Sequence, residues 1–221
     1  MKRIFIIVTL LLFVGVVKSA FYDFRKVNFA GIHLNNAETL SEKINKLKSN
    51  GIRDLFTFRI HNDGASHVII LGGCSSNITK FLVWFTDRKT YVQAFDECYT
   101  YNPKEIDATE LFNLYTKNSA LIIKENVLPA LAKGAHMDIF IFELLDRDTL
   151  VKKQFDHEYD LDSPKFYPDA YSTPQYKKAL GIYQANTQTN LSKLLPLMIK
   201  ARIQYYKNLE SDKIQKVSGG L

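Results

Sequence analysis

The 221 residues include 29 lysines and arginines against 23 aspartates and glutamates, a net charge of +6, and 46% of them are hydrophobic. This apolar content excludes a chain too polar to fold, and the length suits one packed domain. No repeat, low-complexity segment or linker rich in proline and glycine divides the sequence, so we expect a single domain over residues 20–210.

The N-terminus has the three parts of a secretory signal peptide. Residues 2–3 are basic, residues 4–17 are apolar apart from one threonine and one glycine, and small residues follow at Ser19 and Ala20. The apolar run is too short to span a bilayer, which needs about 20 residues, and no later run is longer. We therefore expect a signal peptide over 1–19, a secreted protein and no membrane anchor.

Removal of that segment takes away three basic residues and no acidic ones, so the net charge falls to +3. An excess this small does not by itself indicate a nucleic-acid-binding protein. The sequence also lacks a glycine-rich phosphate loop, a His-Glu-x-x-His zinc motif, a Cys-x-x-Cys pair and a Gly-x-Ser-x-Gly elbow. We expect no cofactor and no metal.

Export also suggests two covalent modifications. An even number of cysteines in an oxidising compartment usually forms disulfides, which would pair Cys74 with Cys98. Two Asn-x-Ser/Thr acceptors for N-glycosylation begin at Asn77 and Asn190. Asn77 lies in a turn-like stretch, so it is the more usable of the two.

The first half of the mature chain is predicted to be mostly strands. A short strand over 27–29 precedes a helix that carries an apolar stripe between Asn36, a good N-cap, and Gly51, a good C′ residue. Short runs typical of strands then follow at Leu55–Ile60, His67–Leu71, Ile78–Phe85 and Tyr91–Phe95. The last three would form an antiparallel meander. That arrangement would place Cys74 and Cys98 at the same edge of the sheet.

The second half is predicted to be mostly helical, which makes the fold class α+β. The candidate helical segments are Asp107–Tyr115, Asn126–Ala132 and Ile139–Lys153, although Ile139–Phe142 also fits a strand. Thr173 and Pro174 begin another helix, which continues through Leu191 until Pro196 kinks or ends it. A last helix over Leu197–Leu209 precedes a disordered tail over 211–221.

The order of these elements resembles the N-terminal half of the ribosome-inactivating proteins. Asn28-Phe29 occupies the first strand, the helix follows, and Lys89-Thr90-Tyr91-Val92-Gln93-Ala94-Phe95 ends the meander. These plant and bacterial toxins are hydrolases that remove one adenine from ribosomal RNA. The resemblance implies an antiparallel or mixed sheet followed by helices, ribosomal RNA as partner, a monomer, and Tyr91 as the ring that stacks on the adenine.

The central helix of that family resembles residues 183–192 of this chain. In this register Gln188 occupies the position of the catalytic glutamate and Leu191 that of the catalytic arginine. Asn126 lies near the position of the second stacking tyrosine. A glutamine carries no charge and a leucine donates no proton, so this register implies a toxin scaffold with severely reduced or absent catalysis.

A second register keeps both charges. Residues 128–133 resemble the lead-in to the family's catalytic helix, which places Arg147 at the arginine and Glu143 one residue from the glutamate. It requires a deletion of some forty residues after Tyr91. Three functions therefore remain open: an rRNA N-glycosylase, a non-catalytic member of that family, and an unrelated secreted binding or effector protein of α+β fold.

Overall fold

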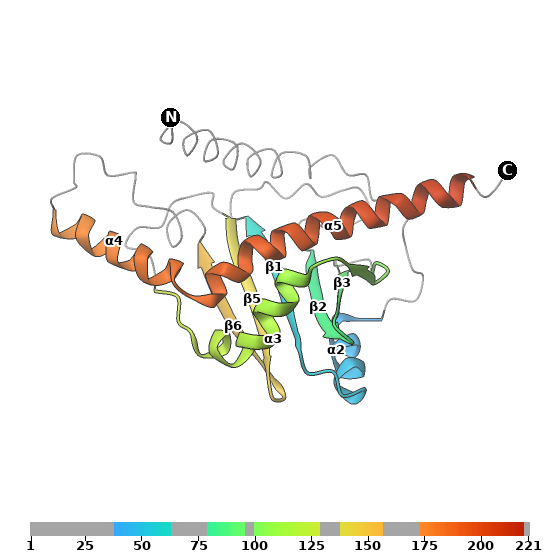
Figure 1. Ribbon diagram of the computed structural model, residues 1–221, viewed down its shortest axis with the longest axis horizontal. Coiled ribbons are helices and arrows are strands. Elements are labelled where there is room, and N and C mark those ends of the chain that lie inside the picture. The colour runs from blue at the N-terminus through green and yellow to red at the C-terminus, as the bar shows by residue number, and fades with distance from the viewer. Residues whose placement is uncertain (1–37, 63–78, 96–99, 129–137, 157–172, 219–221) are drawn as a thin grey trace. The chain divides into compact units, whose positions relative to one another are not determined.

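The computed structural model describes residues 38–62, 79–95, 100–128, 138–156 and 173–218 (Figure 1). Several sequence predictions lie outside these ranges. They are the signal peptide, the strands over 27–29 and 67–71, Cys74, Cys98 and Asn77.

The described part of the chain is α+β, as predicted. Its strands form one antiparallel sheet with the order β4-β3-β2-β1-β5-β6. The strands are β1 (Leu55–Asn62), β2 (Lys80–Thr86), β3 (Lys89–Phe95), β4 (Lys104–Ile106), β5 (Asp138–Asp146) and β6 (Thr149–Asp156). Strands β1 to β4 follow one another across the sheet, and the β5–β6 hairpin pairs with the free side of β1.

One face of the sheet packs against two helices, α3 (Thr109–Lys124) and α5 (Asn190–Ser218) (Figure 1). Phe56 contacts Tyr115 of α3 with ring centroids 4.9 Å apart, and Phe81 contacts Tyr205 of α5 at 6.2 Å. The buried Tyr205 hydroxyl accepts from the Ala94 amide at 3.1 Å and donates to the carbonyl of residue 102 at 3.0 Å. We call this the α3/α5 face, and it holds most of the core.

The other face, called the α2 face, packs against α2 (Leu40–Ser49). Ile44 and Leu47 of this helix join an apolar cluster with side chains from β1, β2, β3 and β5. The N-cap of α2 is Thr39, which forms a capping box with Glu42, where the sequence had suggested Asn36. The predicted C-terminal glycine, Gly51, is correct, because its φ of 79° is one that other residues avoid.

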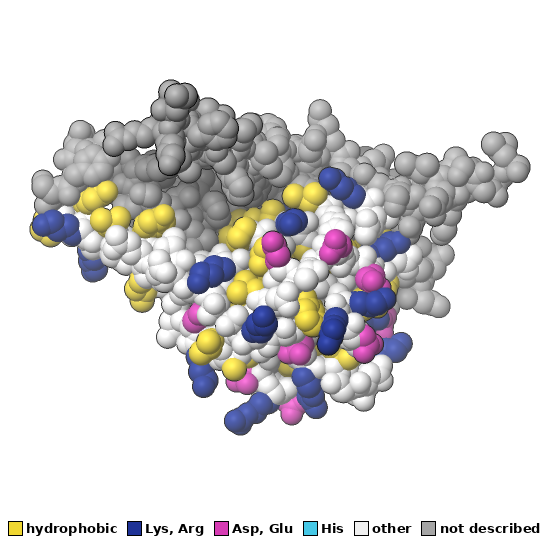
Figure 2. All heavy atoms as spheres, in the orientation of Figure 1, with side chains coloured by type: hydrophobic (Ala, Val, Ile, Leu, Met, Phe, Trp, Pro, Cys, Tyr) yellow, Lys and Arg dark blue, Asp and Glu magenta, His cyan; other side chains and the backbone are white. Residues whose placement is uncertain are grey.

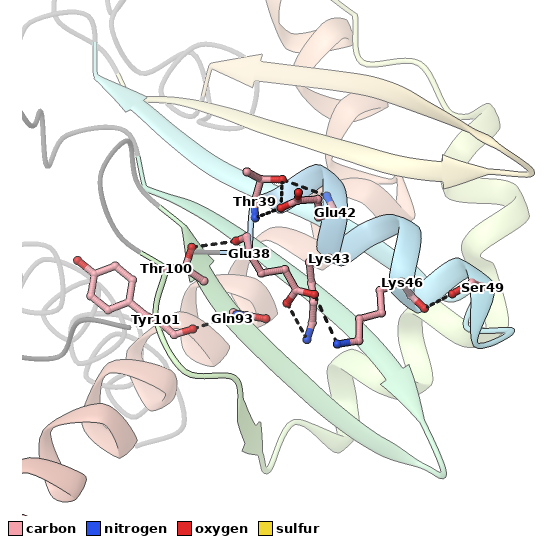
Figure 3. A network of polar contacts seen from close by, with 9 residues as sticks. All are labelled: Glu38, Thr39, Glu42, Lys43, Lys46, Ser49, Gln93, Thr100 and Tyr101. Carbon is pink, nitrogen blue, oxygen red and sulfur yellow. Dashed lines mark hydrogen bonds and ion pairs between the residues drawn. The ribbon is translucent and has the colours of Figure 1, made fainter. Parts of the chain in front are cut away.

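Polar contacts fasten α2 to the sheet (Figure 3). The Thr100 hydroxyl donates to the Glu38 carbonyl at 3.0 Å, and the Glu38 carboxylate forms an ion pair with Lys43 at 3.4 Å. Beneath them, Gln93 of β3 donates from Nε2 to the Tyr101 carbonyl at 3.0 Å. The segment after β3 is therefore tied both to its own strand and to the start of α2.

The largest correction concerns residues 139–153, which form most of the β5–β6 hairpin and not a helix. Phenylalanine and isoleucine alternate at the start of β5, and the polar sequence Asp146-Arg147-Asp148 provides the turn. Arg147 takes a φ of +54° in that turn, a conformation that is rare in helices. The strand that residues 139–142 suggest continues to Asp146, and pairing with β1 and β6 holds it.

The helix boundaries also differ from those predicted. α3 runs on to Lys124, and residues 126–128, predicted to begin a helix, follow it as an irregular segment. α4 (Pro174–Thr187) begins at Thr173 and Pro174 as predicted, but it ends before Gln188. Pro196 lies inside α5, and α5 runs to Ser218, through part of the segment 211–221 for which a disordered tail is predicted.

No helix within the described ranges combines the length and the hydrophobicity needed to cross a bilayer.

Candidate functional site

Tyr91, the predicted base-stacking residue, lies on β3 and points to the α2 face. Its ring stacks on that of Trp84, with centroids 5.5 Å apart and planes 12° from parallel, and it packs against the apolar cluster beneath α2. The Lys43 ammonium lies 5.5 Å from the Trp84 ring, within cation–π range. One face of Tyr91 is thus already occupied by another aromatic ring, and only part of the side chain is exposed.

The hydroxyl of Tyr91 meets a charged pair at the edge of the sheet. The hydroxyl donates to Glu105 Oε2 at 3.3 Å. The same carboxylate oxygen accepts a hydrogen bond from the Lys89 ammonium at 2.8 Å. The hydrogen bond and charge of Lys89 hold the pKa of the Glu105 carboxyl below its ordinary value. The acid that Tyr91 contacts is therefore an exposed carboxylate at its hydroxyl end.

Gln188, the residue at the family's glutamate position, lies at a corner on the other side of the sheet. It is the exposed C-cap of α4, and Leu191 beyond it is fully buried at the start of α5. This corner packs against the segment after α3, which includes the exposed Asn126. The structure thus brings Gln188 and Asn126 to one region, and places Tyr91 in another.

The contacts at this corner hold backbone in place. Asn186 is 1% exposed, and its amide donates to the Leu128 carbonyl at 3.0 Å and accepts from the Leu128 amide at 2.8 Å. The Glu125 carboxylate accepts from the backbone amides of Asn190 and Leu191, both at 2.9 Å. These two amides belong to the first turn of α5, so Glu125 satisfies donors that a helix N-terminus leaves free.

The Glu125 carboxylate also accepts a hydrogen bond from the side chain of Asn190, the second predicted glycosylation acceptor. Its Nδ2 donates to Glu125 Oε1 at 2.8 Å. A glycan there would replace one of the two hydrogens of this nitrogen, directly beside the Glu125 carboxylate. The folded structure therefore disfavours Asn190 as an acceptor.

The residues of the second register, Glu143 and Arg147, lie on the β5–β6 hairpin. Glu143 projects from β5 on the α2 face and accepts a hydrogen bond from the Thr57 hydroxyl at 2.7 Å. Arg147 is exposed in the turn, and its carbonyl accepts from the Arg53 guanidinium at 3.4 Å. Neither lies on the helix that this register requires.

The predicted site residues therefore do not form one site. Two strands separate Tyr91 on β3 from Glu143 on β5, which amounts to about 14 Å at the usual strand spacing of ~4.8 Å. Lys153 shows that the Gln188 corner lies on the α3/α5 side of the sheet. Its cross-strand partner on β5, Phe142, belongs to the α3/α5 face, so Lys153 projects from that face too. Its ammonium donates to the Glu125 carbonyl, which is part of the corner, at 2.6 Å. The sheet lies between that corner and Tyr91.

Comparison with known proteins does not identify a family or a function for this chain. No protein-family model, curated protein or solved structure matches this chain. The resemblance to the ribosome-inactivating proteins stays a prediction based on the sequence pattern.

Sequence reasoning missed two residues that the structure makes prominent. Glu125 adjoins Asn126, but its role depends on residues 65 and 66 positions later, which no local pattern reveals. Arg59 lies on β1 and faces Lys80 across the strand pair on the α2 face. The sequence shows that Arg59 is basic, but it does not reveal the strand register that places Arg59 directly opposite Lys80.

Proposed function

We propose that this chain is a secreted protein that acts by binding a partner and not by catalysis. The separation of the predicted catalytic and base-binding side chains carries the proposal. Tyr91 lies on the α2 face, Gln188 at the α4–α5 corner on the opposite side, and Glu143 about 14 Å from Tyr91.

The chemistry of adenine removal explains why this separation matters. The reaction needs a carboxylate beside a developing oxocarbenium ion and a proton donor at the departing base. Both groups act on one nucleotide held against an aromatic ring, so they must converge within a few ångströms of that ring. Tyr91 instead stacks on Trp84, which suits a structural role at the edge of the apolar cluster.

The rRNA N-glycosylase is the second candidate, and one observation favours it. Glu105 places a carboxylate at 3.3 Å from the Tyr91 hydroxyl, which would provide the acid that the first register lacks. The ion pair with Lys89 offsets its negative charge, and no described contact brings an arginine to this pair. This arrangement makes Glu105, and not Gln188, the residue to test for activity.

A ribosome depurination assay separates the two candidates. We expect the mature protein, in molar excess over ribosomes, to release no adenine above the buffer level. Release that falls about 100-fold or more in Tyr91→Ala and in Glu105→Gln would overturn the binding proposal, because removal of a catalytic charge has effects of that order. Glu110→Gln, an exposed glutamate on α3, is the matched control for loss of one surface acid.

Secretion is tested with the unaltered chain. We expect a eukaryotic host to export the protein and to remove residues 1–19 or 1–20, so that N-terminal sequencing of the protein in the medium begins at Ala20 or Phe21. Replacement of Leu11 and Leu12 by arginine should retain the protein inside the cell, because charges interrupt the apolar segment. An uncleaved chain that remains in the cytosol would contradict export.

A further inference from the structure

Along β1, away from its Leu55 end, polar and charged side chains join the apolar ones on the α2 face of the sheet. The register places Glu143, Thr57, Leu82 and Gln93 in one row across β5, β1, β2 and β3. The next row, farther along β1, consists of Ile141, Arg59, Lys80 and Phe95. Two cations therefore lie side by side between two buried apolar residues.

Arg59 and Lys80 are direct cross-strand partners. Side chains in such positions start from Cβ atoms about 4.5–5.5 Å apart, and like charges directly opposite each other destabilise a sheet. Both side chains are only partly exposed, and their apolar neighbours Ile141 and Phe95 are 4% and 5% exposed. This environment screens the repulsion poorly.

No counter-charge among the described residues relieves this repulsion. The nearest acid on this face, Glu143, is diagonal to Arg59 and hydrogen-bonds to Thr57, and no ion pair joins it to either cation. The Nε of Arg59 is buried without a hydrogen-bond partner in the described chain. A buried donor without a partner is unfavourable, so its retention calls for an explanation.

We propose that Arg59 and Lys80 bind a phosphate group that carries two negative charges. The planar guanidinium of Arg59 offers two parallel donors to two phosphate oxygens, and the Lys80 ammonium supplies a second charge to a third. Bound at the exposed end of the guanidinium, the ligand would neutralise the opposed cations together. On the α3/α5 face the Nε of Arg202 is also buried without a hydrogen-bond partner among the described residues, but its guanidinium lies over the rings of Phe81 and Tyr206, and the surface charges in Figure 2 are interspersed.

Titration of the mature protein with inorganic phosphate tests the proposal. We expect saturable binding by calorimetry and a rise in Tm that exceeds the rise in sodium chloride of equal ionic strength. Arg59→Gln and Lys80→Gln should each weaken binding about tenfold or more, the loss expected for one charge-assisted contact. Arg59→Lys, which keeps the charge but loses the fork, should lie between Arg59→Gln and the wild type.

A second readout distinguishes this site from a structural role of the same residues. Without phosphate, Arg59→Gln and Lys80→Gln should have a Tm equal to or above that of the wild type, because each removes a repulsion. With saturating phosphate the order should reverse. Lys117→Gln, an exposed lysine on α3, should change neither value. Equal phosphate affinity in Arg59→Gln and the wild type, or no binding beyond the chloride control, would refute the site.

The source of the phosphate is the remaining variable. A free ion and a phosphomonoester share the same chemistry, so parallel titrations with inorganic phosphate and O-phosphoserine identify which one binds more tightly. The phosphate site rests on the proposed binding function, but different experiments test the site and the function. Adenine release in the depurination assay would refute the proposed function and leave the phosphate titration unaffected.

Discussion

Phe56→Ala is expected to lower the free energy of unfolding by about 3–5 kcal/mol, the range for deletion of a large buried aromatic side chain. Phe56 is fully buried and joins four elements. Its ring centroid lies 6.2 Å from Phe85 on β2, 4.9 Å from Tyr115 on α3 and 5.9 Å from Phe142 on β5. Alanine would leave a cavity at the point where the β5–β6 hairpin, the meander and α3 meet.

Equilibrium urea unfolding, followed by far-UV circular dichroism, measures this loss. Because a loss of this size approaches the total stability of many domains, Phe56→Leu provides a variant that still folds, with an expected loss of about 1–2 kcal/mol. The matched control is Leu150→Ala on β6, where the side chain is 41% exposed and the expected change is within about 0.5 kcal/mol. Equal losses in Phe56→Ala and Leu150→Ala would contradict the packing described for the α3/α5 face.

The sequence predicts local structure well where the signal lies within a few residues. The stripe of Ile44 and Leu47 with Gly51 after it identified α2, and Thr173 with Pro174 identified the start of α4. The β5–β6 hairpin was mistaken because its strands carry leucine, lysine and glutamate, which also suit helices. There the pairing with β1 decides the structure, and that partner lies some 80 residues earlier.

The candidate site was less predictable, because it depends on which face each strand presents. Tyr91 fits the expected strand position, but the register with β2 places its ring on Trp84. Gln188 fits a helix pattern, but α4 ends just before it. Hydrogen bonds of Asn186 and Glu125 hold the turn that follows between α4 and α5. A shift of one residue along a strand exchanges the two faces, so motif spacing alone leaves such positions open.

Glu125→Ala is expected to lower the free energy of unfolding by about 2–3 kcal/mol, the combined order of a lost N-cap and of hydrogen bonds to a charged acceptor. The carboxylate accepts three hydrogen bonds, from the Asn190 amide, the Asn190 side chain and the Leu191 amide, at 2.8–2.9 Å. Its negative charge also lies at the positive end of α5. The measurement is urea unfolding at pH 7.

Two further variants show whether the loss comes from the cap. Asn190→Ala should cost less than Glu125→Ala, and in the Glu125→Ala background it should add little, because the partner of its side chain is already gone. Glu110→Ala, whose carboxylate lies 3.8 Å from Lys200 on an exposed surface, should change stability by less than about 0.5 kcal/mol. Full additivity of Glu125→Ala and Asn190→Ala would show that the two side chains do not interact, and a loss in Glu125→Ala no larger than that in Glu110→Ala would show that Glu125 does not cap α5.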